Sequence, residues 1–110
     1  MDEITEREYA LTEAMKENRD YQRYLFLEAE LQKNRELKKQ VDEFRLRNYY
    51  LQESEVDLYE AVDEVDREFQ ELQKIPVVNA YLDAELSVCK MIQRVLETIS
   101  QEVQIAEPEI

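Results

Sequence analysis

The chain has 110 residues, of which 14 are basic and 27 acidic, so its net charge is −13, and it contains no histidine and no glycine. Because phosphate backbones and anionic lipids are bound mainly through lysine and arginine, this charge disfavours direct contact with nucleic acids or membranes. The lack of histidine removes the commonest general base and zinc ligand, so we expect a protein that is not an enzyme.

The same composition predicts an all-α fold. Glycine is absent and the only prolines are Pro76 and Pro108, so the residues that form tight β-hairpin turns are almost missing. A chain of this length can build one self-sufficient core. We therefore expect residues 1–110 to form a single helical domain, with helical hairpins around a long central helix, in a multi-helix bundle that is dimeric.

Cysteine usage and hydropathy indicate the compartment. Cys89 is the only cysteine, so neither an internal disulfide nor a multi-cysteine metal site can form within one chain. No apolar run approaches the roughly 20 residues that span a bilayer, and the N-terminal segment "MDEITERE" is too acidic for a targeting peptide. These features predict a cytoplasmic protein without a cofactor.

The first two predicted helices are short. Thr5 and Glu8 have the spacing of a capping box, after which a helix is predicted to run to about Lys16. A second helix follows, with Asn18 or Asp20 as its cap. We expect these two helices to form a hairpin.

A sustained apolar stripe follows Asn34, which is a third plausible cap. Its members recur every three or four residues: Leu37, Val41, Phe44, Asn48, Leu51, Glu55, Leu58, Val62, Val65, Phe69 and Leu72. A continuous helix over 35–74 would be about 60 Å long, too long to lie within a compact domain of this size. The alternative is a break at Ser54, but we favour a continuous or gently kinked helix.

Pro76 is expected to end that helix near Ile75 and to occupy the first turn of the next one. This last helix is predicted to run to about Gln104. The tail, from about 105 to 110, is expected to be frayed.

Glu85 is the one carboxylate on the stripe of the last helix, which otherwise contains Tyr81, Val88, Ile92, Val95 and Ile99. A carboxylate on a packing face requires a charged or hydrogen-bonding partner. Arg45 is one candidate and tyrosine hydroxyl groups are others. We interpret Glu85 as a residue that specifies how helices or subunits fit together, without a catalytic role.

Two other features allow a functional interpretation but favour a structural one. Carboxylates alone can bind iron, manganese or magnesium, and nine of them lie between residues 53 and 71: Glu53, Glu55, Asp57, Glu60, Asp63, Glu64, Asp66, Glu68 and Glu71. Di-iron bundles, however, also use histidine, so we interpret this run as a solvated face and expect no metal. Cys89, beside Val88, is interpreted as a small core hydrophobe.

Six of the seven tyrosines lie on or next to apolar stripes: Tyr21, Tyr24, Tyr49, Tyr50, Tyr59 and Tyr81. Tyrosine packs its ring while its hydroxyl group seeks a polar partner, which suits both core edges and interfaces. We favour the core edge, with a subunit or partner interface as the alternative.

The segments "NRDYQRYLFLEAELQKNRELKKQVDEFR" at 18–45 and "LQKIPVVNAYLDAELSVCKMIQRV" at 72–95 resemble the YlbF/YmcA/YheA family of small helical bacterial proteins. The resemblance covers nearly the whole chain, and the short length is most similar to the YheA branch. It implies an oligomeric all-α fold without enzymatic activity. Better-studied members are cytosolic subunits of a complex that modulates the endoribonuclease RNase Y. Some members have additional cysteines linked to iron–sulfur clusters, which this sequence lacks.

The leading hypothesis is therefore a cytosolic, non-enzymatic regulatory adaptor that assembles through helix packing. Its expected partners are itself, as a homodimer or larger oligomer, related helical subunits, and an RNase Y-type mRNA-processing complex. The alternative is a coiled-coil-like structural or chaperone-type protein. Candidate interaction residues are Tyr21, Tyr24, Phe44, Arg45, Phe69, Tyr81 and Glu85.

Overall fold

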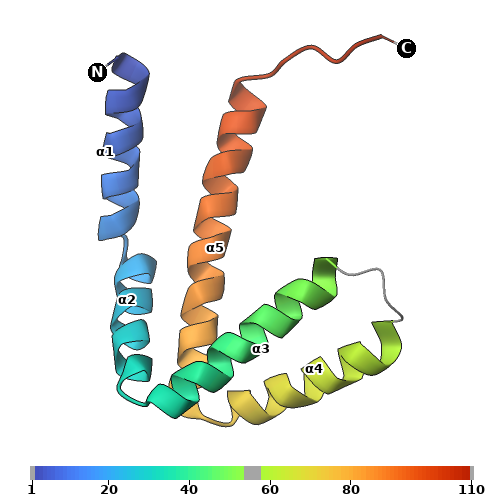
Figure 1. Ribbon diagram of the computed structural model, residues 1–110. Coiled ribbons are helices and arrows are strands. Elements are labelled where there is room, and N and C mark those ends of the chain that lie inside the picture. The colour runs from blue at the N-terminus through green and yellow to red at the C-terminus, as the bar shows by residue number, and fades with distance from the viewer. Residues whose placement is uncertain (1, 54–57, 110) are drawn as a thin grey trace.

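The computed structural model describes residues 2–53 and 58–109. Within them the chain forms helices and no strand, which confirms the all-α prediction (Figure 1). In chain order the helices are α1 (Glu3–Glu17), α2 (Arg19–Gln32), α3 (Arg35–Glu53), α4 (Leu58–Gln73) and α5 (Pro76–Glu102).

The first helix begins earlier than predicted. Asp2 is its N-cap, and Asp2 Oδ1 accepts a hydrogen bond of 2.8 Å from the Thr5 backbone N–H. This bond, because it favours the carboxylate, lowers the pKa of Asp2 below its ordinary value. The predicted capping box at Thr5 and Glu8 is therefore wrong, since Asp2 has the same three-residue spacing to Thr5 and caps the helix first.

The other predicted helix starts are confirmed. Asn18 accepts from the Asp20 backbone N–H at 2.8 Å and caps α2, and Asn34 accepts from the Leu37 N–H at 3.2 Å. Pro76 occupies the first turn of α5, where its missing N–H leaves no donor unsatisfied.

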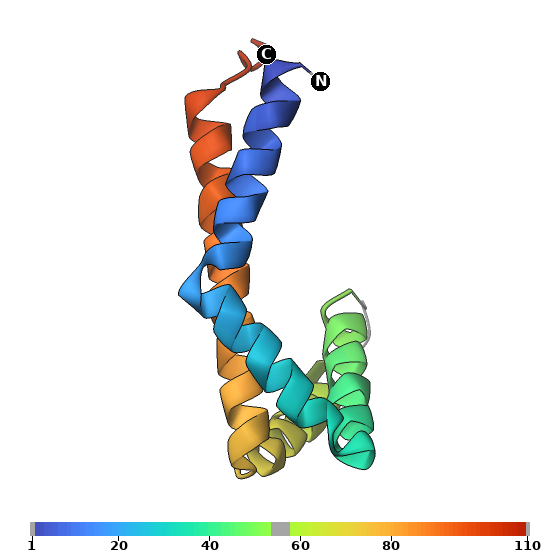
Figure 2. The same cartoon turned by 90° about the vertical axis from the view of Figure 1, so that its left-hand side faces the viewer.

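The predicted hairpin between the first two helices is wrong. Helix α2 continues in roughly the direction of α1, with a bend, and α2 packs against α5, which runs the opposite way (Figures 1 and 2). Asn18 alone separates the two helices, in an extended conformation with φ −63° and ψ 143°. One such residue bends the chain, whereas reversing it requires a longer loop.

The predicted continuous helix over 35–74 is also wrong. Helices α3 and α4 are separate and pack antiparallel to each other (Figure 1). Phe44 and Phe69, both on the predicted stripe, stack with ring centroids 5.8 Å apart, and Arg47 pairs with Glu68. The stripe thus buries itself by folding back on its own second half. Ser54, the predicted break, lies outside the described residues.

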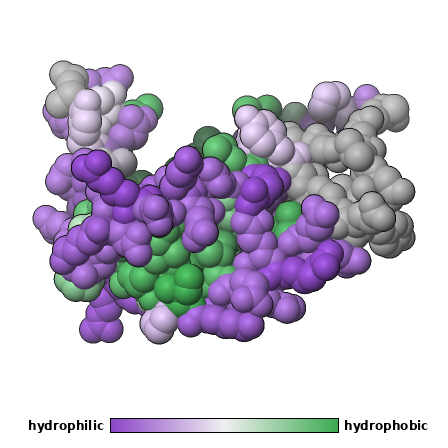
Figure 3. Space-filling view, turned by 60° about the horizontal axis from the view of Figure 1, so that its bottom comes forward, coloured by the Kyte–Doolittle hydropathy of each residue, from purple (hydrophilic) through white to green (hydrophobic). Residues whose placement is uncertain are grey.

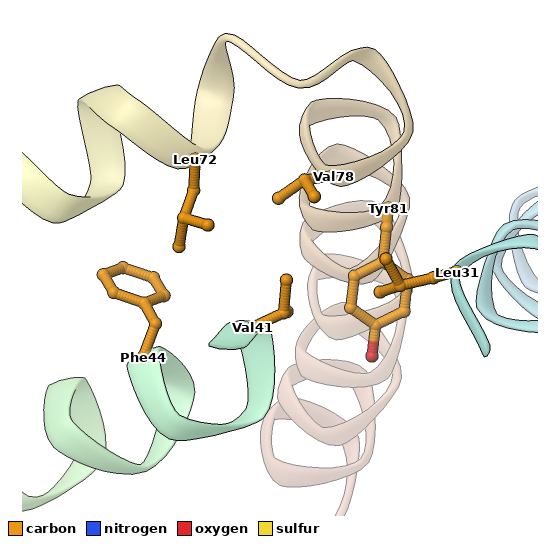
Figure 4. Close-up of a cluster of buried hydrophobic side chains, with 6 residues drawn as sticks. All are labelled: Leu31, Val41, Phe44, Leu72, Val78 and Tyr81. Carbon is orange, nitrogen blue, oxygen red and sulfur yellow. The ribbon is translucent and has the colours of Figure 1, made fainter. Parts of the chain in front are cut away.

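The hydrophobic core lies where α2, α3, α4 and α5 meet (Figure 4). Its buried members are Leu31, Val41, Phe44, Leu72, Val78 and Tyr81. Leu31, Val41 and Val78 are fully buried, and burial of each such side chain stabilises the fold by about 1.5–3 kcal/mol. On the face shown in Figure 3, a hydrophobic area surrounded by polar side chains is visible near this end of the molecule.

The core joins two arms. We call α1, α2 and α5 the long arm, and the antiparallel pair of α3 and α4 the short arm (Figure 1). The radius of gyration is 18.3 Å, whereas a compact domain of this length has about 13 Å. The chain is therefore open, and much of the long arm is not covered by the rest of the chain.

Candidate functional site

Arg45 of α3 and Glu85 of α5 form an ion pair between the two arms. Arg45 Nε lies 3.1 Å from Glu85 Oε2, which confirms the predicted partner. Arg45 Nη1 also donates a hydrogen bond of 3.0 Å to the Tyr81 hydroxyl oxygen. The guanidinium carbon lies 5.8 Å from the Tyr81 ring centroid, within the range of a cation–π contact. One arginine thus links the charge and the aromatic ring of α5 to α3.

The ion pair is only partly buried, with side-chain exposures of 39% for Arg45 and 28% for Glu85. Glu85 Oε2 itself is buried and accepts no hydrogen bond from the described residues, so its contact with Arg45 is a charge contact. Burial is the largest single effect and lowers the pKa of Arg45, but the nearby groups Glu85, Tyr81, Tyr24 and Asp42 together outweigh it, and the pKa is raised. The guanidinium therefore remains positively charged.

Three tyrosines extend this cluster from α5 to α2. Tyr24 stacks on Tyr81 with centroids 5.6 Å apart, and Tyr21 stacks on Tyr24 at 6.2 Å. Burial is the main cause that raises the pKa of Tyr24, followed by its hydrogen bond with Tyr81 and then the one with Glu28. The cluster therefore ties three helices together through aromatic and charged contacts.

The structure brings the predicted site residues into two adjoining groups. Tyr21, Tyr24, Tyr81, Arg45 and Glu85 form the cluster just described. Phe44 and Phe69 stack next to it, inside the short arm. Tyr81 and Phe44 are buried in the core, so these two side chains act within the chain.

An open groove of about 1000 Å³ lies between the short arm and α5. Its apolar lining includes Phe44, Leu46, Val65, Phe69, Leu82 and Leu86, with Tyr49 and Cys89 beside them. Its charged lining residues are Asp42, Arg45, Asp66, Asp83 and Glu85. The sequence did not predict this groove, because Leu46 and Leu86 are not members of the apolar stripes.

Cys89 corrects a prediction. It is exposed and lines the groove, whereas the sequence suggested a core position beside Val88. The buried residues of α5 are Val78, Tyr81, Ala84, Val88 and Met91, which recur every three or four residues. Cys89 is one residue beyond this stripe, on a part of α5 that no described element covers.

The acidic run behaves as a solvated face where its side chains are described. Asp63, Glu64, Asp66 and Glu71 are exposed, while Glu68 is half-buried against Arg47. The structure does not describe the side chains of Glu53, Glu55, Asp57 and Glu60. Among the described residues no group of three or more cysteine or carboxylate side chains is placed to hold a metal ion.

Exposed apolar side chains gather on α1 and on the C-terminal half of α5. We call this set the arm surface: Ile4, Leu11, Ile92, Leu96, Ile99 and Val103, which are between 41% and 73% exposed. Helix α1 has no buried residue at all. An isolated helix of 15 residues is marginally stable in water, so α1 gains little support from the rest of the chain. In the described part of the chain, no helix combines the length and the hydropathy that crossing a membrane requires.

Comparison with known proteins places the chain among regulators. The family model described as "Control of competence regulator ComK, YlbF/YmcA" matches residues 4–104. A protein of Caldicellulosiruptor bescii named "UPF0342 protein" is 22% identical over 103 residues, which cover 90% of this chain and 87% of that protein. No solved structure matches the chain. Because the family model spans nearly all of the sequence, the chain belongs to the YlbF/YmcA family of competence regulators.

Proposed function

We propose that this protein is a cytosolic, non-enzymatic adaptor that regulates by binding other proteins through helix packing. The observation that carries the proposal is the arm surface, where apolar side chains of α1 and α5 are exposed and α1 has no buried residue. Ile92, Leu96 and Ile99 of α5 and Val103 at its C-cap recur every three or four residues and so share one face of the helix, and such exposed apolar stripes mark interaction surfaces in proteins. The regulatory description of the family supports the same role.

A second copy of this chain, as a homodimer or larger oligomer, or a related helical subunit is the first partner in this proposal. Two long arms packed together would cover the apolar residues of both, as in a helix bundle. The whole chain of 1–110 would then act as one unit. The net charge of −13 favours protein partners over nucleic acids or membranes.

The downstream target in this proposal is an RNase Y-type mRNA-processing complex, in which contact with RNA is left to the nuclease. The predicted interaction residues have a positioning role in this scheme. Phe44 and Phe69 hold α3 and α4 together within the short arm, and Arg45 links this arm to Tyr81 and Glu85 of α5. Tyr21 and Tyr24 extend the same cluster over α2.

A pulldown from a Gram-positive bacterial lysate, with and without RNase, tests the proposal. Wild-type protein should recover specific stoichiometric partners that survive RNase. Leu96→Asp, which places a charge in the arm surface, should lose them, whereas Thr98→Asp adds the same charge two residues away at an exposed position outside that set.

Recovery that is equal for both variants, or that disappears with RNase, would contradict binding at the arm surface. A coiled-coil-like structural or chaperone-type protein is the second candidate, since the same exposed apolar residues could hold unfolded clients. Weak recovery of many unrelated proteins would support that role and contradict the adaptor.

A further inference from the structure

The groove between the short arm and α5 combines apolar anchors with an acidic lining. Leu46 and Tyr49 of α3 and Leu86 of α5 line it, and each of these side chains is more than half exposed. Aromatic and aliphatic side chains at the centre of a groove are typical anchors for a partner. This arrangement is distinct from the arm surface, whose residues do not line the groove.

The size of the groove suits a helix. A helix is about 10 Å across and rises 5.4 Å per turn, so the groove volume of about 1000 Å³ corresponds to roughly two turns. Grooves of this kind bind amphipathic helices that insert their apolar face.

The charged residues that line the groove indicate the charge that a bound partner should carry. Four carboxylates line the groove, at Asp42, Asp66, Asp83 and Glu85, against the single cation Arg45. Two of these carboxylates have partners outside the groove lining: Asp42 pairs with Lys38 and Asp83 with Arg23. Glu85 pairs with Arg45, so Asp66 is the lining carboxylate without an ion pair among the described residues, and the groove keeps a net negative charge.

A second copy of this chain fits the groove poorly. Among the helices of the described residues, α1, α2, α4 and α5 carry net negative charge: −3 on α1, −1 on α2, −5 on α4 and −2 on α5. Only α3 is positive, at +1, and α3 is itself a wall of the groove. The charge that complements this groove therefore favours a different protein as the partner.

We propose that this groove binds a basic amphipathic helix of a partner protein, with its apolar face against Leu46, Tyr49 and Leu86 and its lysine or arginine side chains near Asp66 and Asp83. This inference rests on the proposed adaptor function and specifies the chemistry of the partner. Glu85 stays paired with Arg45, so the ion pair forms part of the groove floor.

The test uses a fluorescent synthetic peptide of leucine and lysine with helical periodicity, and a matched peptide with glutamate in place of lysine. Binding to the full chain is measured by anisotropy. The basic peptide should bind at one per chain and the acidic one should not. Asp66→Lys should weaken binding by about tenfold or more, because it places like charges together.

Control variants separate the groove from the overall charge of the protein. Glu97→Lys makes the same charge reversal at an exposed α5 position outside the groove lining. Leu25→Ala, at an exposed α2 position outside both the groove lining and the arm surface, matches Leu86→Ala. Both controls should bind the basic peptide with nearly the affinity of the wild type, whereas Leu86→Ala should weaken that affinity severalfold. Equal loss in Asp66→Lys and Glu97→Lys, or equal binding of both peptides, would overturn the proposal.

Two outcomes distinguish this inference from the adaptor function itself. If Asp66→Lys and Leu86→Ala reduce the mass of the protein in solution, the groove is an interface between copies and the proposal is wrong. If the wild type recovers a stoichiometric partner in the pulldown and both groove variants recover it equally, the adaptor function stands and the groove assignment fails. Peptide binding at the groove without any stoichiometric lysate partner would support the groove and contradict the adaptor function.

Discussion

Arg45 and Glu85 join the two arms of the molecule, with Arg45 Nε 3.1 Å from Glu85 Oε2 and Tyr81 beside them. Arg45 and Glu85 both line the open groove between the short arm and α5. We propose that the pair has a structural role, since it links α3 to α5.

Glu85→Gln should lower the free energy of unfolding by about 1 kcal/mol, since the pair is partly exposed and solvent screens it. Far-UV circular dichroism should show unchanged helix content, with a lower midpoint in urea. Glu71→Gln breaks the much more exposed pair with Lys74 and serves as the control. Equal midpoints for the two variants would mean that the Arg45–Glu85 pair contributes nothing special to the fold.

Phe69→Asp should unfold or separate the short arm. Phe69 stacks on buried Phe44, so a carboxylate there loses the aromatic contact and is placed against the core. The expected loss is about 3 kcal/mol or more, read from thermal melting. Phe26→Asp, at an α2 position that is 64% exposed, is the matched control and should change folding stability little. A Phe69→Asp protein that melts like the control would refute the stacking of α3 on α4.

Tyr24 makes stability depend on alkaline pH. Its pKa is raised in the fold, chiefly by burial, above the ordinary value of 10.0. As the pH rises, the Tyr24 hydroxyl group therefore loses its proton in the unfolded chain before it does so in the folded one. Its contribution to the free energy of unfolding is complete below pH 10 and declines as the pH rises toward the pKa in the fold.

Tyr24→Phe removes this titration together with the hydrogen bonds of the hydroxyl group. The variant should be less stable than wild type at pH 8 by about 1 kcal/mol, and the difference should shrink above pH 10. Urea unfolding at pH 8 and at pH 11 measures both. A difference that stays constant over this range would contradict a half-buried, hydrogen-bonded hydroxyl group at Tyr24.

Asp2 makes the start of α1 sensitive to acid. The hydrogen bond from Thr5 lowers the pKa of Asp2. The stabilisation of α1 by the Asp2 carboxylate is therefore complete above pH 3.8, the ordinary pKa of this group, and is lost as the pH falls below that value. Asp2→Ala should speed amide hydrogen exchange at the start of α1, because the cap is lost. Asp2→Asn should keep the cap and remove its pH dependence. If exchange at Thr5 is the same in both variants, Asp2 is not the cap.

Local features of the fold followed from the sequence because they depend on neighbouring residues. Asn18, Asn34 and Pro76 each start a helix where their side-chain or ring chemistry predicts it. The Arg45–Glu85 pair was one of the alternatives that the sequence offered, since a carboxylate on a packing face requires a charged or hydrogen-bonding partner and Arg45 follows Phe44 on the neighbouring stripe.

The path of the chain was not predictable from periodicity. The stripe that contains Phe44 and Phe69 is the same for one long helix and for two helices folded against each other. Likewise, nothing in the spacing around Asn18 distinguishes a bend from a reversal. The exposure of Cys89 depends on which side of α5 is covered by α2. This is determined by tertiary packing and not by the spacing of residues along the helix.

The central claim is that another protein chain, first of all a second copy, covers the arm surface. Sedimentation equilibrium of wild type, Leu96→Asp and Thr98→Asp tests it most directly. Wild type and Thr98→Asp should have at least twice the chain mass of 13.3 kDa, and Leu96→Asp should have the mass of one chain. Wild-type protein that sediments as a single 13.3 kDa chain, or a Leu96→Asp variant that assembles like wild type, would contradict the claim.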